Sequence, residues 1–307
     1  MIDAIVRSLA ACVLLSACGR LGFEAAPRDA DPEPVPDAAV DAAIDADVPL
    51  GPFGAAEIIP GLEDPVAADD DPSLTGDLLE IYFKSDRATP GDFDIFVARR
   101  ASTDEPFGAA ERVDELSTTG FEATPEVSLD GLTIYLAVDR PGGMGGTDLW
   151  RSTRASRDDP WDPPELVADL SSSAADFAAV RDQAEQRVVF NRQVNGHSFD
   201  LFEAVRDGDG WSVPEPIPAL ATMPYEADAH LSPDGLLLLF AGELGEQGRD
   251  IYRSERPDLD SPFGPPEALE ELATASADED PWLSPDGRLI VFSSDRGGDQ
   301  ELYWARR

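Results

Sequence analysis

The amino-acid sequence predicts an all-β fold, a five-bladed β-propeller of four-stranded blades. Two markers repeat along the chain with one period, which lies between 50 and 54 residues when successive positions are subtracted. Propeller blades have periods of about 40 to 50 residues. The first marker is an aromatic residue followed shortly by Pro or Ala and Glu, at Phe53, Phe107, Trp161, Trp211 and Phe263. The second is an acid before two large apolar residues, at Asp94, Asp148, Asp200, Asp250 and Glu301.

The last unit shows the elements of a blade most clearly. A short inner strand ends in Ser284-Pro-Asp-Gly287, whose Asp-Gly pair favours a tight turn because both residues tolerate left-handed backbone angles. The apolar run Leu289-Ile-Val-Phe292 follows, and such a run is typical of a strand that is covered on both faces. A Gly-rich loop leads to a third strand at Glu301. We expect the fourth strand of each blade to begin at the aromatic marker.

The phase of the repeat predicts how the ring closes. The chain enters the repeats on an aromatic-marker strand, Phe53 to Ile59, which has no blade of its own. It stops just after the strand Glu301 to Arg306, so the last blade lacks its outer strand. Pairing of these two strands would remove exposed sheet edges. We therefore expect residues 53–59 to complete the final blade.

Three motifs in these units resemble the TolB-type, WD-like propeller repeat. They are Ser284-Pro-Asp-Gly287, Ser294-Asp-Arg296 and the segment Pro141-Gly-Gly-Met-Gly-Gly146 that leads to Asp148. The resemblance covers residues 51–307 and is strongest in the second and fifth units. It implies an exported protein that acts as an interaction platform, often near the cell envelope.

The third and fourth units depart from this repeat. In the third unit, Arg181-Asp-Gln stands in place of the Ser-Pro-Asp turn and Asn191-Arg-Gln in place of Ser-Asp-Arg. The fourth unit keeps Ser232-Pro-Asp-Gly235 but has Gly242-Glu-Leu where Ser-Asp-Arg is expected. Because Ser-Asp-Arg recurs at one blade position, at 85–87 and 294–296, we expect it to make structural hydrogen bonds and ion pairs rather than to clamp a ligand.

Residues 1–17 have the pattern of a lipoprotein signal peptide. The apolar run Leu9 to Leu15 is too short to span a bilayer as a helix but suits the central region of a secretory signal. Leu15-Ser-Ala-Cys-Gly19 resembles the lipobox of bacterial lipoproteins, in which the signal is cut before the cysteine. The resemblance implies that Cys18 carries the acyl chains of a stable membrane anchor. An ordinary signal peptide that ends near a cysteine is the alternative.

Residues 18–50 are predicted to form a disordered tether between the lipid and the propeller, residues 51–307. They are rich in Ala, Asp and Pro and contain few large apolar groups that would offset the entropy of ordering. Repelling charges and stiff prolines extend such a segment. Gly19 follows the cysteine where an aspartate would favour the inner membrane. We therefore expect export and lipid anchoring at the periplasmic face or the surface of the outer membrane.

The net charge of −39, from 62 acidic and 23 basic residues, argues against nucleic acid as a partner. Such a surface attracts cations and basic partner surfaces. Strong acidity also keeps an exported protein soluble without any binding role. The two cysteines are Cys12 and Cys18, so no disulfide framework is available to the propeller.

Acids recur just before the strand expected nearest the axis of each blade. In a closed ring they would converge near one mouth of the central channel and bind Ca²⁺, which takes several oxygen ligands, or a basic peptide. A solvated acidic rim that repeats because the blade repeats is the alternative. The candidates are Asp69, Asp70, Asp71, Glu122, Asp176, Glu226, Asp228, Asp278, Glu279 and Asp280. His230 is a further candidate because it lies near Asp228 in the same strand; a hydrogen-bonded structural histidine is the alternative, and the one that we favour.

An enzymatic reading is the second hypothesis. Five-bladed propellers include glycosidases that hold carboxylates near the axis, one as acid and another as base or nucleophile. The acids here follow the repeat and single out no acid–base pair. The other histidine, His197, belongs to an expected loop, and no G-x-S-x-G, H-E-x-x-H or paired C-x-x-C motif occurs.

We therefore expect a lipid-anchored propeller of the cell envelope that presents a non-enzymatic surface for a protein or ligand. A glycoside hydrolase, or another carbohydrate-active enzyme that uses axial carboxylates, is the alternative.

Overall fold

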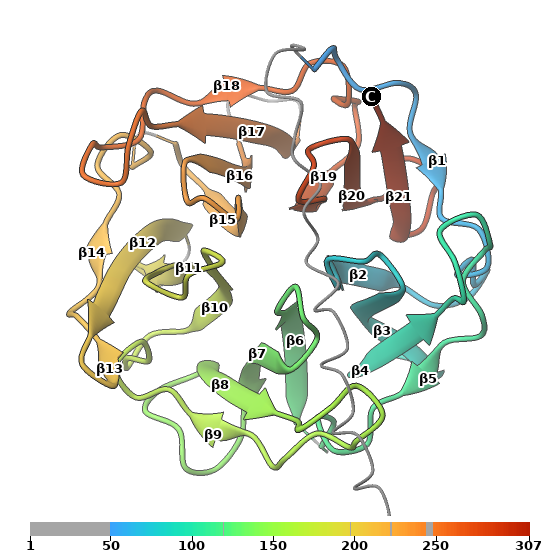
Figure 1. Ribbon diagram of the computed structural model, residues 1–307, viewed down its shortest axis with the longest axis horizontal. Helices are drawn as coiled ribbons and strands as arrows, with labels where there is room; N and C mark the ends of the chain where they lie inside the picture. The colour runs from blue at the N-terminus through green and yellow to red at the C-terminus, as the bar shows by residue number, and fades with distance from the viewer. Residues whose placement is uncertain (1–49, 119, 197, 222, 244–247) are drawn as a thin grey trace, which may run out of the picture. The chain divides into compact units, whose positions relative to one another are not determined.

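The computed structural model describes residues 50–307 except 119, 197, 222 and 244–247. The regular structure of these residues consists of strands alone, in five antiparallel sheets around a central axis (Figure 1). The predicted five-bladed propeller is confirmed. Within the described residues no helix is long and apolar enough to cross a membrane.

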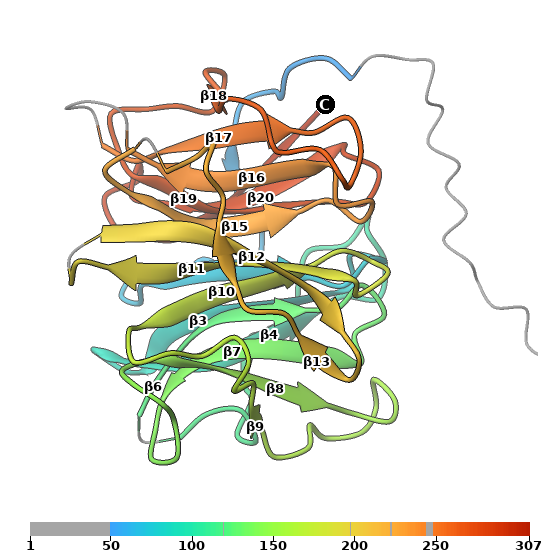
Figure 2. The same cartoon turned by 90° about the vertical axis from the view of Figure 1, so that its left-hand side faces the viewer.

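Each blade runs outward from its inner strand, as β15, β16 and β17 show side by side in Figure 2. The first blade contains β2 (Asp69–Leu74), β3 (Glu80–Thr89), β4 (Asp92–Arg99) and β5 (Glu111–Arg112). The second contains β6 (Phe121–Val127), β7 (Thr133–Asp139), β8 (Asp148–Thr153) and β9 (Glu165–Leu166).

The third blade has an extra short strand. It contains β10 (Asp176–Arg181), β11 (Arg187–Val194), β12 (Ser198–Asp207), β13 (Gly210–Trp211) and β14 (Glu215–Pro216). The fourth contains β15 (Glu226–Leu231), β16 (Leu237–Gly242), β17 (Asp250–Glu255) and β18 (Glu267–Ala268). The fifth contains β19 (Asp278–Leu283), β20 (Leu289–Ser294), β21 (Glu301–Arg306) and β1 (Glu57–Ile58).

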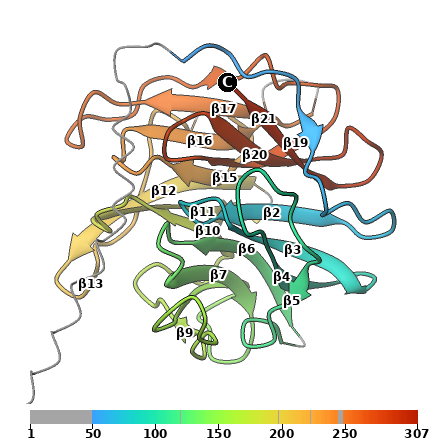
Figure 3. The ribbon, with the colours of Figure 1, turned by 45° about the vertical axis from the view of Figure 1, so that its right-hand side comes forward.

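The pairing of β1 with β21 confirms the predicted closure of the ring. Glu57 pairs with Trp304 and Ile58 with Tyr303 in an antiparallel ladder. The Ile59 amide donates to the carbonyl of Leu302 at 2.9 Å. Figures 1 and 3 show the first described strand lying against the last one. The two ends of the propeller therefore share one sheet.

The outer strands begin four residues after each aromatic marker, not at the marker as the sequence predicted. The reason is that each marker ring packs under an arginine from the end of the third strand. The guanidinium carbons lie 4.2 to 4.9 Å from the ring centroids. These pairs are Arg100–Phe107, Arg154–Trp161, Arg206–Trp211, Arg256–Phe263 and Arg307–Phe53.

Four of these arginines also hold the turn after the inner strand. Their Nε–H groups donate to the turn carbonyls at 2.6 to 2.8 Å, with Leu78, Gly131, Gly235 and Gly287 as the acceptors. Three of the acceptors are glycines with φ of 70° to 75°, the left-handed region in which glycine is favoured. The aromatic marker and the Asp-Gly turn are thus parts of one contact, which explains why they repeat together.

The apolar runs form the second strand of each blade, and they are buried as predicted. Ile81, Tyr82 and Phe83 have no exposed surface, and neither do Val188, Val189 and Phe190. Neighbouring blades cover both of their faces. At about 25 cal/mol per Å² of buried apolar surface, these strands are a main source of stability.

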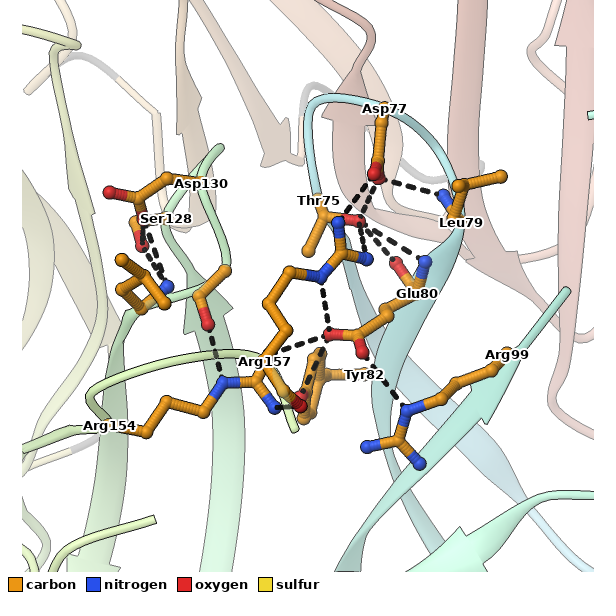
Figure 4. A network of polar contacts seen from close by, with 12 residues as sticks. Thr75, Asp77, Leu79, Glu80, Tyr82, Arg99, Ser128, Asp130, Arg154 and Arg157 are labelled. Carbon is orange, nitrogen blue, oxygen red and sulfur yellow. Dashed lines mark hydrogen bonds and ion pairs between the residues drawn. The ribbon is translucent and has the colours of Figure 1, made fainter. Parts of the chain in front are cut away.

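Charged groups also cross the contact between the first two blades (Figure 4). Glu80 at the start of β3 receives Arg99 Nε at 3.0 Å and Arg154 Nη2 of the second blade at 2.7 Å. The side chains of Glu80 and Arg154 are 5% and 1% exposed. Burial tends to raise the pKa of Glu80, but Arg154 outweighs it, so the pKa lies below its ordinary value.

We expect Phe53→Ala to destabilise the protein by about 3 kcal/mol, because the change removes a buried ring and the support of Arg307 at the closure of the ring. Urea unfolding followed by circular dichroism measures the loss. Val213→Ala, at a position that is 84% exposed, is the control and should leave the midpoint in place. An unchanged midpoint for Phe53→Ala would show that this contact does not contribute to closure.

We expect Glu80→Gln to cost about 3 kcal/mol near pH 7, because it leaves the buried Arg154 without a carboxylate. The pKa of Glu80 is lowered, so its stabilising effect is present above the ordinary glutamate value of 4.5 and is lost as the pH falls. The difference between the two proteins should therefore shrink in acid. Denaturant unfolding at several pH values measures it, with Glu105→Gln at an exposed position as the control.

Candidate functional site

Every inner strand carries a β-bulge at the same position. The pairing register shifts there in all five blades. The bulged residues have φ between 44° and 55°, the left-handed region that residues other than glycine rarely adopt. They are Asp71, Thr124, Ala178, Asp228 and Asp280. Such strain gathers at functional sites, so these five residues mark where the site should be sought.

Side chains connect the bulges of neighbouring blades. The Thr124 amide donates to Asp71 Oδ2 at 2.9 Å, and the Ala178 amide donates to Thr124 Oγ1 at 3.0 Å. The side chain of Ala178 has no hydrogen-bond acceptor for the next bulge. The Asp228 amide donates instead to Asn191 Oδ1 at 3.4 Å. Some of the polar side chains near the axis therefore stabilise the backbone of the bulges.

One set of the predicted acids lies inside the blades. These residues come two positions before each bulge and have no exposed surface; they are Asp69, Glu122, Asp176, Glu226 and Asp278. Asp69 pairs with Arg87 at 2.6 Å, and Asp278 pairs with Arg296 at 2.5 Å. The expected structural role of Ser-Asp-Arg is thus seen at both of its occurrences.

The remaining members of this set are bonded in related ways. Asp176 pairs with Arg192 at 2.5 Å, so the third blade keeps the arginine contact although its motif differs. Glu122 accepts from the Thr118 hydroxyl, and Glu226 accepts from the Met223 amide at 2.8 Å. The structure therefore places Glu122, Asp176 and Glu226 within blades, away from the cavity at the channel mouth.

A second set of acids does converge at one mouth of the channel. We call Asp70, Asp71, Asp228, Glu279 and Asp280 the acid cage. They come from the first, fourth and fifth blades and line a cavity of about 220 Å³. Of the candidates, Asp70, Asp228 and Glu279 are brought together here. The inner strands β2, β15 and β19 that carry them lie around the axis in Figure 1.

Two cations enter the acid cage, and neither was predicted. Lys84, the single lysine of the chain, places Nζ 3.1 Å from Asp70 Oδ2 and 3.0 Å from Asp71 Oδ2. Arg249 forms an ion pair with Glu279. Among the described residues, no cation pairs with Asp228 or Asp280. The acid cage therefore holds more carboxyl groups than cations.

Burial and these charges drive the carboxyl pKa values apart. Burial tends to raise the pKa of Asp70, but Lys84 outweighs it and holds the pKa well below its ordinary range. Burial raises the pKa of Asp228 and Asp280 well above 3.8, and neighbouring carboxyl groups add to the rise. A carboxyl group whose ionised form is favoured therefore lies beside two whose protonated form is favoured.

The predicted calcium ion has suitable ligands here. Oxygen atoms of Asp70, Asp71 and Asp280 lie within 4.8 Å of one another, and carboxylates are the ligands that Ca²⁺ prefers. The ammonium of Lys84 lies between two of them. An ion could enter only after Lys84 moves away, so calcium remains a prediction.

Aromatic rings form the opposite wall of the same cavity. Phe121 contacts Phe177 edge to face at a centroid distance of 6.3 Å, and Phe177 contacts Phe199 in the same way at 5.6 Å. Phe199 contacts Tyr225 at 5.9 Å, and the Arg249 guanidinium lies 4.2 Å from the Tyr225 ring. Sequence reasoning missed this wall because its rings stand at three different positions of the repeat, and each position is aromatic in only one or two blades.

His230 does not join the acid cage. It lies beyond the bulge of β15 and lines a separate cavity near the other end of the channel. His197 lies outside the described residues. So do Cys18, the predicted signal peptide at 1–17 and nearly all of the predicted tether at 18–50, which therefore remain predictions.

The fold is similar to solved propellers of two kinds. TolB from Acinetobacter baumannii has a TM-score of 0.50 and 16% identity, over 77% of this chain and 54% of that one. The chain thus spans about half the length of TolB. An α-L-arabinofuranosidase from Podospora anserina, solved in complex with cellotriose, has a TM-score of 0.56 and 13% identity, over 81% of this chain and 94% of that one.

The catalytic domain of an α-L-arabinofuranosidase from Coprinopsis cinerea has a TM-score of 0.55 and 13% identity, over 83% of this chain and 96% of that one. No family model matches the sequence, and no curated protein matches it. At these identities the likeness shows the propeller fold alone.

We expect Asp228→Asn to stabilise the protein near pH 7 by about 1 to 3 kcal/mol and to have little effect near pH 4. The raised pKa of Asp228 means that the folded state keeps a proton which the unfolded state releases. Its contribution is therefore present below the ordinary value of 3.8 and is lost as the pH rises, whereas asparagine stays neutral. Urea unfolding at both pH values tests this.

Asp209→Asn makes the same change at an exposed turn and serves as the control. A difference between Asp228→Asn and the unmodified protein that is equal at both pH values would contradict the raised pKa.

Proposed function

We propose that the chain is an exported, lipid-anchored propeller of the cell envelope that binds a basic partner at the acid cage without turnover. The observation that carries the proposal is the environment of the Lys84 ammonium group. Its ammonium lies between two carboxylates and 5.3 Å from the Phe93 ring. The cage thus already holds an organic cation of the chain itself, in a combination of carboxylates and aromatic rings that suits cations.

The carboxyl groups of Asp228 and Asp280 are where a partner would bind. Asp228 and Asp280 line the same cavity as the aromatic wall and have no cation of their own among the described residues. A lysine or arginine side chain from a partner would pair with them. The net charge of −39 would raise the association rate of a basic surface. Similarity to TolB, itself a propeller, is consistent with an envelope protein.

Binding of a cation should release protons, because the raised pKa values of Asp228 and Asp280 favour their protonated forms and a bound cation favours the ionised ones. We therefore expect the affinity for lysine- and arginine-containing peptides to rise with pH and to fall with salt. Calorimetry of the soluble chain from residue 50 onward with basic, neutral and acidic peptides tests this.

Asp228→Asn should weaken binding of the basic peptides about tenfold, whereas Asp209→Asn at an exposed turn should not. Equal binding of basic and neutral peptides, or no binding of either, would overturn the proposal. An affinity capture from envelope extracts with the unmodified chain would then identify the partner.

A glycoside hydrolase is the second candidate, and the divergent pKa values of the acid cage favour it. A base such as Asp70 and a protonated acid such as Asp228 are the pair that glycoside cleavage needs. The chain aligns with nearly the whole length of the two arabinofuranosidases that have a similar fold. The ion pair between Lys84 and Asp70 argues against this role, because it leaves Asp70 less able to act as a base.

A panel of chromogenic glycosides and plant and bacterial polysaccharides distinguishes the two functions. Turnover that disappears in both Asp70→Asn and Asp228→Asn would establish the hydrolase and replace the binding proposal. Absence of turnover over the whole panel, together with binding of basic peptides, would exclude it.

A further inference from the structure

A second cavity lies at the opposite end of the channel, where the inner strands turn back. We call it the turn-side cavity; its volume is about 250 Å³. It is lined by the ends of β6, β10, β15 and β19 and by the turns that follow the first three of these strands. A small cavity of about 10 Å³ at the ring of bulges lies between it and the acid cage, and the two larger cavities share no lining residue. The two cavities are therefore separate places on the propeller.

Arg181 is the first unusual residue in this cavity. Its backbone pairs with Val188 as Leu74, Val127, Leu231 and Leu283 pair with the second strands of the other blades. An arginine thus stands where four blades have an aliphatic core residue. The turn itself is formed by Asp182 to Glu185, one residue later than the sequence comparison placed it.

The Arg181 side chain is only 6% exposed. Its Nη1 pairs with Glu185 at 2.5 Å, and the guanidinium lies 4.4 Å from the Tyr135 ring. Its Nε–H finds no acceptor among the described residues. A buried donor without a partner is costly, and leucine at this position would avoid the cost.

His230 is the second unusual residue. It lies two positions after the bulge, where the other blades have Ser73, Glu126, Val180 and Trp282. It is 8% exposed, contacts Trp282 edge to face at 5.9 Å, and its Nε2 has no hydrogen-bond partner in the described part of the chain. Burial lowers its pKa to about 3, so the imidazole is neutral at physiological pH.

Glu126 completes the set of polar groups. It lines the turn-side cavity and accepts from the Ser73 hydroxyl at 3.3 Å. Burial, with the neighbouring Asp71, raises its pKa well above the ordinary value, which favours the protonated form that can donate a hydrogen bond. Three polar groups from three different blades, of which Arg181 and His230 are almost fully buried, thus face one cavity, and none of them is required by the blade repeat.

We propose that the turn-side cavity binds a small uncharged polyhydroxyl molecule, a single sugar or a polyol, through Arg181, His230 and Glu126. A hydroxyl group accepts from the Arg181 Nε–H and donates to the His230 imidazole, so one kind of group satisfies both. An anion would be repelled by Asp130, Asp182 and Glu185, which line the same cavity. A cation would meet Arg181. This inference does not depend on the function proposed for the acid cage.

The histidines allow a direct test, because the chain contains two, His197 and His230. Nitrogen NMR of ¹⁵N-labelled protein observes both imidazoles, and His230→Gln assigns the signals. The probes are common hexoses, pentoses, amino sugars and polyols at millimolar concentration. We expect at least one of them to shift the His230 nitrogen signals in a saturable way and to leave those of His197 unchanged. No shift with any of them would overturn the proposal and leave a water-filled cavity.

Arg181→Leu supplies a second test with little risk to folding, because leucine occupies this position in three of the other blades. We expect the melting temperature to be kept or raised and the affinity for the bound probe to fall about tenfold or more. Arg151→Leu makes the same change at an exposed position of β8 and should bind as before. Equal affinity in Arg181→Leu would show that the ligand lies elsewhere.

Discussion

Closure of the ring by β1 on β21 is the contact on which the rest of the structure depends. A two-residue strand and the stacking of Arg307 on Phe53 join segments that lie at opposite ends of the propeller sequence. Closure removes both free sheet edges and covers the apolar second strands on both faces. It also brings the fifth blade against the first, where the Asp69 amide donates to the Gln300 carbonyl at 3.0 Å. The acid cage spans this seam, so the candidate site exists only in the closed ring.

The bulge in each inner strand divides the channel into two chemically different halves. It changes the register once, so that side chains on either side of it can both be directed to the axis. On one side lie the acid cage and its aromatic wall. On the other side lie His230, Glu126 and Arg181, which line the more enclosed turn-side cavity. One backbone irregularity, repeated five times, thus provides two places for different ligands.

Arginine explains much of the architecture. One arginine in every blade stacks on the aromatic marker, and another holds the buried acid at the start of the inner strand in three blades. The planar guanidinium can stack on a ring and donate in several directions at once, which an ammonium cannot. Lys84 stands apart because it serves the acid cage rather than a blade.

The sequence alone determined the number of blades, the closure and the buried second strands, because turns, apolar runs and aromatic markers are local patterns that repeat. Only the tertiary structure decided which role each of several neighbouring acidic residues has. Asp69 pairs with Arg87 inside its blade, Asp70 receives Lys84, and Asp71 takes the left-handed bulge and accepts the Thr124 amide. Three identical residues in a row carry no local signal that tells them apart. Their roles come from the bulge and from partners on other strands and blades, and such partners become visible only when the ring is closed.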